Sequence, residues 1–505
     1  MAKTPLMRLL RRALAEADYS ATRRSFLRTS AIAAAVASTP LFLEGCSKAV
    51  SSQVDRAVKV AVVGAGLAGL HATWLLKKAG VNVELFEGSK RIGGRAFTGN
   101  NVVVEGSTAE LGGEWLDTKH HDMLTLAKTF GVELIDKLAD TGDEVDAFHF
   151  NGRAYTMQDI VREIKPFLAK VAEDVQRLPD NLMDLHKSEA KQLDAMSIDA
   201  YLTSLGMTGW LRSLIEVAYV TENGLELNEQ SALNFILLVG TDLSGGELEF
   251  FGDSDERYVM RGGVQGITSG LFKNVETNTH LNHLFTGLEK DGDQFIVSFT
   301  HEGKNVRIAA AYVVLAVPFS VLRDIPLNVD LPEKKRRVIK ELAYGTNGKV
   351  LFGFTERYWT SKGFSGWMYT EPPLQQLWEN THVPNPKGAG LTMFYGGKSA
   401  DVIRKMSDDE LRALLATTMQ SVWGISDTVK PLRLFRMDWP TQPFAKGSYS
   451  TFAPGQWTEF YGVAGEPVGN LHFAGEHCSL HSQGYLNGGA ETGRLAAERI
   501  LKAVQ

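Results

Sequence analysis

Three glycines and one acid have the types and spacing of a phosphate-binding site. Gly64, Gly66 and Gly69 form a GxGxxG pattern, and Glu87 follows about 20 residues later. In such a pattern the first glycine permits a tight turn, the second lets the backbone approach a pyrophosphate, and the third lets a helix lie close to a strand. A carboxylate at the position of Glu87 can accept hydrogen bonds from a ribose hydroxyl. These residues predict a dinucleotide site.

Two strands and a helix must hold these residues in place. Lys59–Val63 is a short, β-branched apolar run that is typical of a buried strand. Ala68–Ala79 has helical spacing and ends at Gly80, and a second strand is expected over Val81–Phe86. The N-terminus of the helix would offer free N–H groups and the positive end of its dipole to the phosphates. This strand–turn–helix–strand unit is the context that the glycine pattern requires.

The residues after Glu87 indicate which dinucleotide is bound. An IGGR segment that ends at Arg95 can bring a cation against a second face of the pyrophosphate. Here the chain resembles the flavin-containing amine oxidase family, which includes monoamine oxidases, polyamine oxidases and L-amino acid oxidases. The resemblance implies FAD as the cofactor, with contacts from Ser89, Gly94 and Arg95. An ordinary NAD-binding unit followed by a glycine loop is the alternative.

Length and composition exclude several classes of protein. The chain has 505 residues, 44% of them hydrophobic, which is enough for two or three domains. Its net charge of -6 gives no basic surface for nucleic acid. Cys46 and Cys478 are the only cysteines, so no disulfide framework is expected, and no Cys/His cluster has the spacing of metal ligands. We therefore predict neither a nucleic-acid partner nor a metal.

The N-terminus has the pattern of an export signal. A twin-arginine motif, TRRSFLR, precedes a mild apolar stretch over 31–43 that is too short to span a membrane. We expect a signal over 1–46, a polar linker over 47–57, the twin-arginine export machinery as a partner, and a location in the periplasm or cell envelope. A sequence like a lipoprotein cleavage box precedes Cys46, but Glu44 departs from the usual pattern, so a lipid anchor stays open. A chance Arg-Arg pair before a hydrophobic helix is the alternative.

The rest of the chain is expected to fold as an α/β protein with interleaved domains. The resemblance implies a Rossmann-like FAD-binding domain of the amine oxidase type, a mixed-sheet substrate domain, and a helical insertion that caps the substrate cavity. We expect the FAD-binding domain over 57–130, 256–325 and 436–505, the insertion over 131–255, and the substrate domain over 326–435. Apolar patterns also predict a helix over Asp122–Phe130 and strands over Val275–Phe285, Gln294–Thr300 and Ala310–Pro318.

Later segments match cofactor contacts of the resembled family. Ala109–Trp115 contains an LGG that in the family runs under the flavin, with a plain glycine turn as the alternative. A helix that starts near Tyr485 would point the partial positive charge of its N-terminus at the flavin ring. The contacts that the resemblance implies are Gly112, Gly113, Glu114, Trp115, Phe285, Gly475, Glu476 and Leu486.

Four residues match catalytic positions next to the flavin ring in the family. Lys349, at the head of an apolar strand, matches a lysine that reaches flavin N5 through a water, where dioxygen reacts. Trp439 matches an indole beside the flavin, and Tyr449 and Tyr485 match the two walls of an aromatic cage. The alternatives are a lysine that extends to solvent and tyrosines that only pack in the core. Ser448 stands where some members carry the cysteine that bonds to the flavin, so non-covalent FAD is expected.

These parts predict the oxidation of an amine. The cage would hold a primary amine or an L-amino acid against the flavin, hydride would pass to flavin N5, and the imine would hydrolyse to a carbonyl product and ammonia. Dioxygen would then be reduced to hydrogen peroxide. The segment Glu114–Thr118 has no arginine for a substrate carboxylate, which favours amines.

Other functions stay open at this point. An L-amino acid oxidase remains, because an arginine from the insertion could bind the substrate carboxylate. A dehydrogenase would share the cage but pass electrons to an acceptor in the cell envelope. A carotene desaturase or a protoporphyrinogen oxidase would need neither the cage nor Lys349, and a non-enzymatic flavin-binding protein would have no use for the cage. The sequence leaves a homodimer open.

Overall fold

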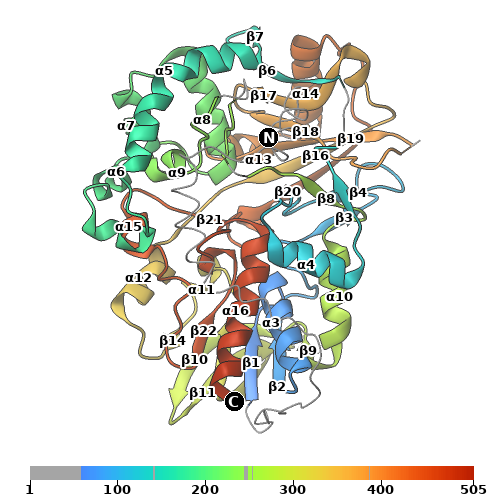
Figure 1. Cartoon of the computed structure of the whole chain (residues 1–505). Coiled ribbons are helices and arrows are strands. Elements are labelled where there is room, and N and C mark those ends of the chain that lie inside the picture. The colour runs from blue at the N-terminus through green and yellow to red at the C-terminus, as the bar shows by residue number, and fades with distance from the viewer. Residues whose placement is uncertain (1–58, 140–142, 244–247, 253, 386, 505) are drawn as a thin grey trace, which may run out of the picture.

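The computed structural model describes residues 59–139, 143–243, 248–252, 254–385 and 387–504. The expected signal, the linker and Cys46 lie outside these residues. The helices and strands form two connected parts, one around a parallel sheet and one around a larger mixed sheet (Figure 1). Residues of both parts line one cavity, which contains most of the predicted site residues.

A five-stranded parallel sheet carries the glycine pattern. Its strands lie in the order β22 (Leu471–Phe473), β13 (Tyr312–Leu315), β1 (Lys59–Val63), β2 (Asn82–Phe86) and β9 (Thr279–His280). The predicted strands around the glycines are confirmed as β1 and β2, which pair in parallel with Val60 opposite Val83. β1 lies in the centre because its apolar side chains are buried. The sheet unites strands far apart in sequence, so distant regions of the chain must meet to form it.

Two helices pack against each other beside this sheet. They are α3 (Leu67–Lys78) and α16 (Leu486–Val504), blue and red in Figure 1. α3 follows the glycine turn, and α16 begins one residue after Tyr485, as the sequence predicts. Their close approach needs a small residue, because a β-carbon at Gly493 would lie 2.3 Å from the carbonyl oxygen of Ala68. This contact holds the C-terminal helix against the helix of the glycine pattern.

One strand prediction is wrong. The sequence predicted a strand over Val275–Phe285, but Val275 ends the helix α10 (Gln265–Val275) and Phe285 belongs to β10 (Leu284–Asp291) in a different sheet. Asn282 has a φ of +58°, so the chain turns between β9 and β10. The predicted segment is therefore divided among the end of a helix, a short strand in the parallel sheet and the start of β10, and the turn at Asn282 is possible because asparagine tolerates this backbone conformation.

A four-stranded sheet adjoins the parallel sheet. Its strands lie in the order β12 (Lys304–Ala310), β11 (Gln294–His301), β10 and β14 (Leu327–Asn328). β11 confirms the strand predicted over Gln294–Thr300, and β13 is a shorter strand within the predicted Ala310–Pro318. The predicted helix after the LGG segment is α4 (His121–Phe130), which ends at Gly131 with a φ of +66°.

A seven-stranded mixed sheet forms the second part. Its order is β20 (Arg433–Asp438), β16 (Gly348–Phe354), β19 (Ala389–Tyr395), β18 (Gln376–Glu379), β17 (Phe364–Thr370), β6 (Val145–Phe150) and β7 (Arg153–Tyr155). All seven residues of β16 are buried, which places Lys349 inside the protein. β6 and β7 come from the segment expected as a helical insertion, so that segment also extends the sheet.

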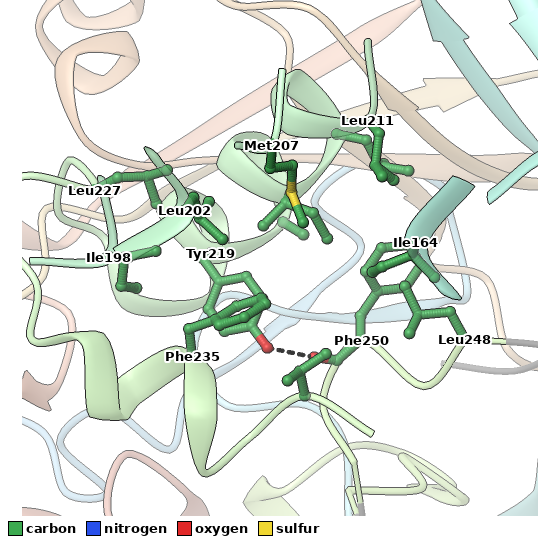
Figure 2. Packing of buried hydrophobic residues seen from close by; sticks show 14 of the residues in the cluster. Ile164, Ile198, Leu202, Met207, Leu211, Tyr219, Leu227, Phe235, Leu248 and Phe250 are labelled. Carbon is green, nitrogen blue, oxygen red and sulfur yellow. Dashed lines mark hydrogen bonds between the residues drawn. The ribbon is translucent and has the colours of Figure 1, made fainter. Parts of the chain in front are cut away.

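The helices expected in the insertion form a separate hydrophobic cluster. α5 (Met157–Gln176), α8 (Gly209–Asn223) and α9 (Ala232–Ile236) bury their apolar faces together (Figure 2). In this cluster the hydroxyl of Tyr219 donates a hydrogen bond of 2.8 Å to the carbonyl oxygen of Phe250. Within the described residues, no helix is long and apolar enough to cross a membrane.

Short elements connect these larger parts. Two-stranded sheets are formed by β3 (Thr98–Asn100) with β4 (Thr108–Glu110), β5 (Leu134–Asp136) with β8 (Tyr258–Met260), and β15 (Ala343–Tyr344) with β21 (Ser450–Thr451). The remaining α-helices are α6 (Lys191–Ala195), α7 (Ile198–Ser204), α11 (Phe319–Leu322), α12 (Glu333–Glu341), α13 (Lys398–Lys405), α14 (Asp408–Trp423) and α15 (Gln456–Phe460). β15 and β21 bring the chain near Lys349 beside the chain near Tyr449.

A methyl group added at Gly493 should destabilise the protein. In Gly493→Ala the new β-carbon would press on the Ala68 carbonyl, and overpacking of this kind costs about 1–3 kcal/mol. Gly489→Ala, on the same helix, is the matched control, because its β-carbon would come no closer than 3.8 Å to Leu67. We expect the midpoint of thermal unfolding to fall for Gly493→Ala and to stay or rise for Gly489→Ala. An equal fall in both variants would contradict the packing argument.

Candidate active site

A cavity of about 750 Å³ joins the two parts of the protein. It is lined by the glycine turn after β1, by the LGG segment, by the residues around Tyr449, and by the start of α16. All the predicted site residues line it except Gly69. A β-carbon at Gly69 would lie 1.9 Å from the Gly64 carbonyl oxygen, so that glycine lets the helix approach the turn.

The cavity has the features of a phosphate site at the start of α3. Gly66, Leu67 and Ala68 line it, and no side chain of the described residues caps this helix end. The N–H of Gly93 donates a hydrogen bond of 2.8 Å to the Ala65 carbonyl, which draws the second glycine loop against the first. Backbone N–H groups and the helix dipole at such a place suit a pyrophosphate.

Glu87 is held rigidly at the edge of this site. Its two carboxylate oxygens accept hydrogen bonds from the N–H groups of Ala65, at 2.7 Å, and Ser89, at 2.8 Å. Each oxygen keeps a further lone pair that a ribose hydroxyl could use. Phe285 also lines this region and is buried, so the structure brings it near the predicted nucleotide contacts.

Arg95 and Glu476 form an ion pair that connects three segments around the cavity. Nη1 of Arg95 lies 2.7 Å from Oε1 of Glu476 and 2.9 Å from the Ser448 carbonyl oxygen. The carboxylate also accepts hydrogen bonds from the N–H and hydroxyl of Ser450 and from the N–H of Gly484. Burial raises the pKa of the Glu476 carboxyl, but the charges of Arg95 and His477, together with the hydrogen bonds from Arg95 and Ser450, outweigh burial and lower the pKa overall. Arg95 and Glu476 therefore also hold the segments around Ser450 and Gly484 together.

The LGG segment lies against Trp439. A β-carbon at Gly112 would lie 1.8 Å from the Arg95 carbonyl oxygen and 3.3 Å from the Trp439 ring, so only glycine fits there. The indole N–H of Trp439 donates a hydrogen bond of 3.0 Å to the Leu111 carbonyl oxygen. A β-carbon at Gly113 would clash with Leu486, which lines the cavity at the start of α16. This packing leaves one face of the LGG backbone open to the cavity.

Lys349 is buried and has an acidic partner that the sequence analysis missed. Its Nζ lies 2.8 Å from Oε2 of Glu114 and donates further hydrogen bonds to the carbonyl oxygens of Glu110 and Gly112. The side chains of Lys349 and Glu114 are 6% and 2% exposed, so the alternative of a lysine that extends to solvent is wrong. The pairing satisfies the charge that burial would otherwise make costly.

Glu114 also contacts two residues that the sequence analysis did not single out. Nε2 of His382 lies 2.7 Å from Oε1 of Glu114, and the indole N–H of Trp378 donates to the same oxygen at 3.2 Å. Burial raises the pKa of the Glu114 carboxyl, but Lys349 and His382 outweigh burial and bring the pKa to about 2. Glu114 is therefore an ionised group at neutral pH in a dry part of the cavity.

The two predicted cage tyrosines meet at a third residue, Glu222. The hydroxyl of Tyr449 donates to the backbone carbonyl of Glu222, and the hydroxyl of Tyr485 lies 3.4 Å from Oε1 of the Glu222 carboxyl. Trp367 and Trp378 line the same cavity, with ring centroids 5.6 Å apart. Tyr449 and Tyr485 therefore line a cavity and do not merely fill a core.

Glu222 could have been suspected from one sequence feature. It lies in the last turn of α8, after an apolar run in which Tyr219, Val220 and Thr221 are all buried. An acid that continues such a run is costly to bury unless its carboxyl has a hydrogen-bond or charge partner. His382 and Trp378 carried no comparable signal, because their contact with Glu114 spans more than 260 residues. Among the residues that the structure describes, no group of His, Cys, Asp and Glu side chains could hold a metal ion.

The parallel sheet, the uncapped helix end and the aromatic cavity are those of a protein that binds a dinucleotide beside an enclosed ligand site. Residues 67–501 match the model of the family described as flavin containing amine oxidoreductase, and the chain belongs to that family. The cofactor is accordingly FAD, and the open backbone at Gly66 and at the LGG segment fits its pyrophosphate and its ring system.

Known proteins of the family resemble the chain over most of its length. A flavin-containing amine oxidase of Danio rerio is 25% identical over 462 residues, which cover 89% of this chain and 86% of the relative. An L-amino-acid oxidase of Demansia vestigiata is 25% identical over 475 residues, covering 90% and 88%. Among solved structures, the cyclohexylamine oxidase of Brevibacterium oxydans has a TM-score of 0.77 at 22% identity, covering 88% of this chain and 99% of that chain. A putrescine oxidase has a TM-score of 0.75 at 20% identity, with the same coverage.

Removing the charge of Glu114 should destabilise the protein in a pH-dependent way. Glu114→Gln leaves Lys349 buried without its counterion, and breaking a buried ion pair costs about 3–5 kcal/mol. Because the folded pKa of Glu114 lies below its usual value of 4.5, its stabilising effect is complete above pH 4.5 and is lost as the pH falls toward 2. Urea unfolding at several pH values should therefore show a large loss at pH 7 that shrinks in acid.

The control for this experiment is an exposed ion pair. Nζ of Lys387 lies 2.5 Å from Oε1 of Glu105 at the surface, and both side chains are more than half exposed. Solvent screens such a pair, so Glu105→Gln should change stability little at any pH. A loss in Glu114→Gln no greater than that in Glu105→Gln would contradict the role of the buried pair.

Proposed function

We propose that this protein oxidises the C–N bond of a primary amine to an imine, while dioxygen is reduced to hydrogen peroxide. The imine would then hydrolyse in water to a carbonyl product and ammonia. The observation that carries the proposal is the pair Tyr449 and Tyr485 in the same cavity as the predicted FAD contacts and Lys349. FAD supplies the redox step when it is bound.

The side chains around the cavity would position the amine and keep it reactive. Tyr449 and Tyr485 would hold it between them, with their hydroxyls fixed by Glu222. The aromatic and apolar lining disfavours an ammonium ion, so the neutral amine that can react becomes more accessible. Trp439 would confine the ring system of the cofactor from the side of the LGG segment. Lys349 is proposed to act where dioxygen reacts, as a cation held by Glu114.

The charged groups of the cavity favour an amine over an L-amino acid. Among the described lining residues, the cations are Lys90, Arg91, Arg95 and Lys349. Arg95 and Lys349 are paired with carboxylates, and Arg91 donates to the carbonyl oxygens of Ile92 and Gly94. None of the four comes from the insertion, which the sequence left open as a source of an arginine for a substrate carboxylate. L-Amino acid oxidation remains the second candidate, because an L-amino-acid oxidase is among the relatives.

Ser448 supports non-covalent FAD. It lines the cavity, and its hydroxyl donates a hydrogen bond of 2.6 Å to Oδ1 of Asn347. A serine oxygen cannot form the thioether that a cysteine would form. The twin-arginine motif likewise supports a proposed location in the periplasm or cell envelope.

Denaturation should release all the FAD. After acid precipitation of the purified protein, we expect the flavin in the supernatant and none in the pellet, because no thiol is present at position 448. The measurement is flavin absorbance in both fractions. Ser448→Cys is a useful comparison, since it introduces at that position the thiol that could bond to the flavin. Flavin retained in the wild-type pellet would contradict the non-covalent assignment.

Amines should reduce the bound flavin in the absence of oxygen. Primary amines and L-amino acids would be added singly to the holoenzyme, and bleaching of the visible flavin band would be followed. We expect bleaching by amines, and rapid return of the colour with hydrogen peroxide when air is admitted. Return of colour without peroxide, or only with an added electron acceptor, would favour a dehydrogenase. An absence of bleaching by every amine would overturn the proposal, and preferential bleaching by L-amino acids would establish the second candidate.

A further inference from the structure

Glu222 joins the two walls of the aromatic cage. It lies in the last turn of α8, and its backbone carbonyl accepts the Tyr449 hydroxyl while its carboxyl faces the Tyr485 hydroxyl at 3.4 Å. The carboxyl lines the cavity. Neither a lysine nor an arginine of the described residues forms an ion pair or hydrogen bond with it. A carboxyl group that a cationic ligand could ionise is therefore available near the hydroxyl ends of both rings.

The two tyrosines extend from the cofactor side of the cavity to Glu222. Tyr449 precedes Ser450 and Tyr485 follows Gly484, and both of those neighbours donate hydrogen bonds to Glu476. The backbones of the two tyrosines thus lie at the Glu476 side of the cavity, and their hydroxyls reach Glu222. An amine held between the rings would have its remaining chain within reach of the carboxyl.

The electrostatic surroundings of Glu222 favour a cation from outside. Burial, followed by the neighbouring charges of Glu256 and Asp117, raises the pKa of its carboxyl to about 8. Glu256 lines the same cavity, and burial also raises the pKa of Asp117, to about 6. A bound ammonium group would relieve the repulsion among these carboxyls and favour the ionised form of Glu222.

We propose that Glu222 determines the substrate class by binding a second ammonium group of the substrate, so that α,ω-diamines are preferred over monoamines and L-amino acids. This inference rests on the proposed amine oxidation and deepens it. One amino group lies neutral between Tyr449 and Tyr485, and the other lies charged against Glu222. A substrate carboxylate at the same place would lie among the carboxyl groups of Glu222, Glu256 and Asp117, which disfavour a further negative charge.

Glu222→Gln tests the charge while it keeps the size and the backbone contact with Tyr449. Holoenzyme of the wild type and variant would be assayed with α,ω-diamines from propane to hexane length and with the n-alkylamines of the same lengths. We expect the diamine-to-monoamine ratio of kcat/KM to fall about ten- to hundredfold, as expected for loss of one charged hydrogen bond. We expect the KM for diamines to rise while kcat changes little, because Glu222 would contact the non-reacting end of the substrate.

Glu216→Gln provides the matched control. Glu216 lies on the same helix, six residues earlier in the chain, and is exposed. This variant should leave the diamine-to-monoamine ratio unchanged. The visible flavin spectrum of each variant would show that the cofactor site is intact before the rates are compared.

The outcomes separate this inference from the proposed function. A selective loss for diamines in Glu222→Gln supports it. Equal losses for diamines and monoamines would overturn it and leave Glu222 as a positioning residue for the tyrosines, and an unchanged ratio would overturn it as well. If no amine reduces the wild-type flavin, the proposed function itself fails, which the anaerobic experiment shows independently.

Discussion

The ion pair between Arg95 and Glu476 is the interaction on which the site depends. Arg95 ends the loop after β2, and Glu476 precedes α16 by ten residues. The same carboxylate binds Ser450 and Gly484, the neighbours of the two cage tyrosines. One partly buried pair therefore connects the predicted pyrophosphate contacts, the aromatic cage and the C-terminal helix. Loss of Arg95 would leave the buried carboxylate of Glu476 without its cation and loosen all three segments at once.

A second buried pair organises the other side of the cavity. Glu114 follows the LGG segment, and Lys349 is the second residue of β16 in the seven-stranded sheet, so their contact joins the two parts of the protein. The cost of burying both charges is offset by further hydrogen bonds from His382 and Trp378 to Glu114 and from Lys349 to two carbonyl oxygens. The lysine proposed to act near dioxygen is thereby fixed in position. Its charge is balanced within a dry environment.

The distribution of charge also separates the two ends of the cavity. Arginines and uncapped N–H groups gather where a pyrophosphate would bind, whereas carboxyls gather around the hydroxyl ends of Tyr449 and Tyr485. An anionic cofactor and a cationic substrate would be drawn to different ends by the same cavity. This arrangement supports the proposed preference for amines.

The sequence by itself determined the local units. The glycine turn with its two strands and helix, the helix after the LGG segment, and the start of α16 all depend on short-range spacing, on apolar periodicity and on glycine positions. These patterns, with the family resemblance, identified the residues that line the cavity. The strand expected over Val275–Phe285 failed because this mostly polar segment contains the end of α10, the short strand β9 and a turn at Asn282, and its apolar spacing does not distinguish them.

Only the tertiary structure decided which charges meet. Lys349 and Glu114 are 235 residues apart, and Tyr485 and Glu222 are 263 apart, so neither pairing follows from spacing along the chain. The addition of β6 and β7 to the sheet containing β16 also depends on a strand partner from a distant segment. Local patterns report which residues are apolar or can turn, whereas the partner of a buried charge is set by how separate elements pack. The cavity and the charges that would select its ligands are therefore formed by the packing of distant segments.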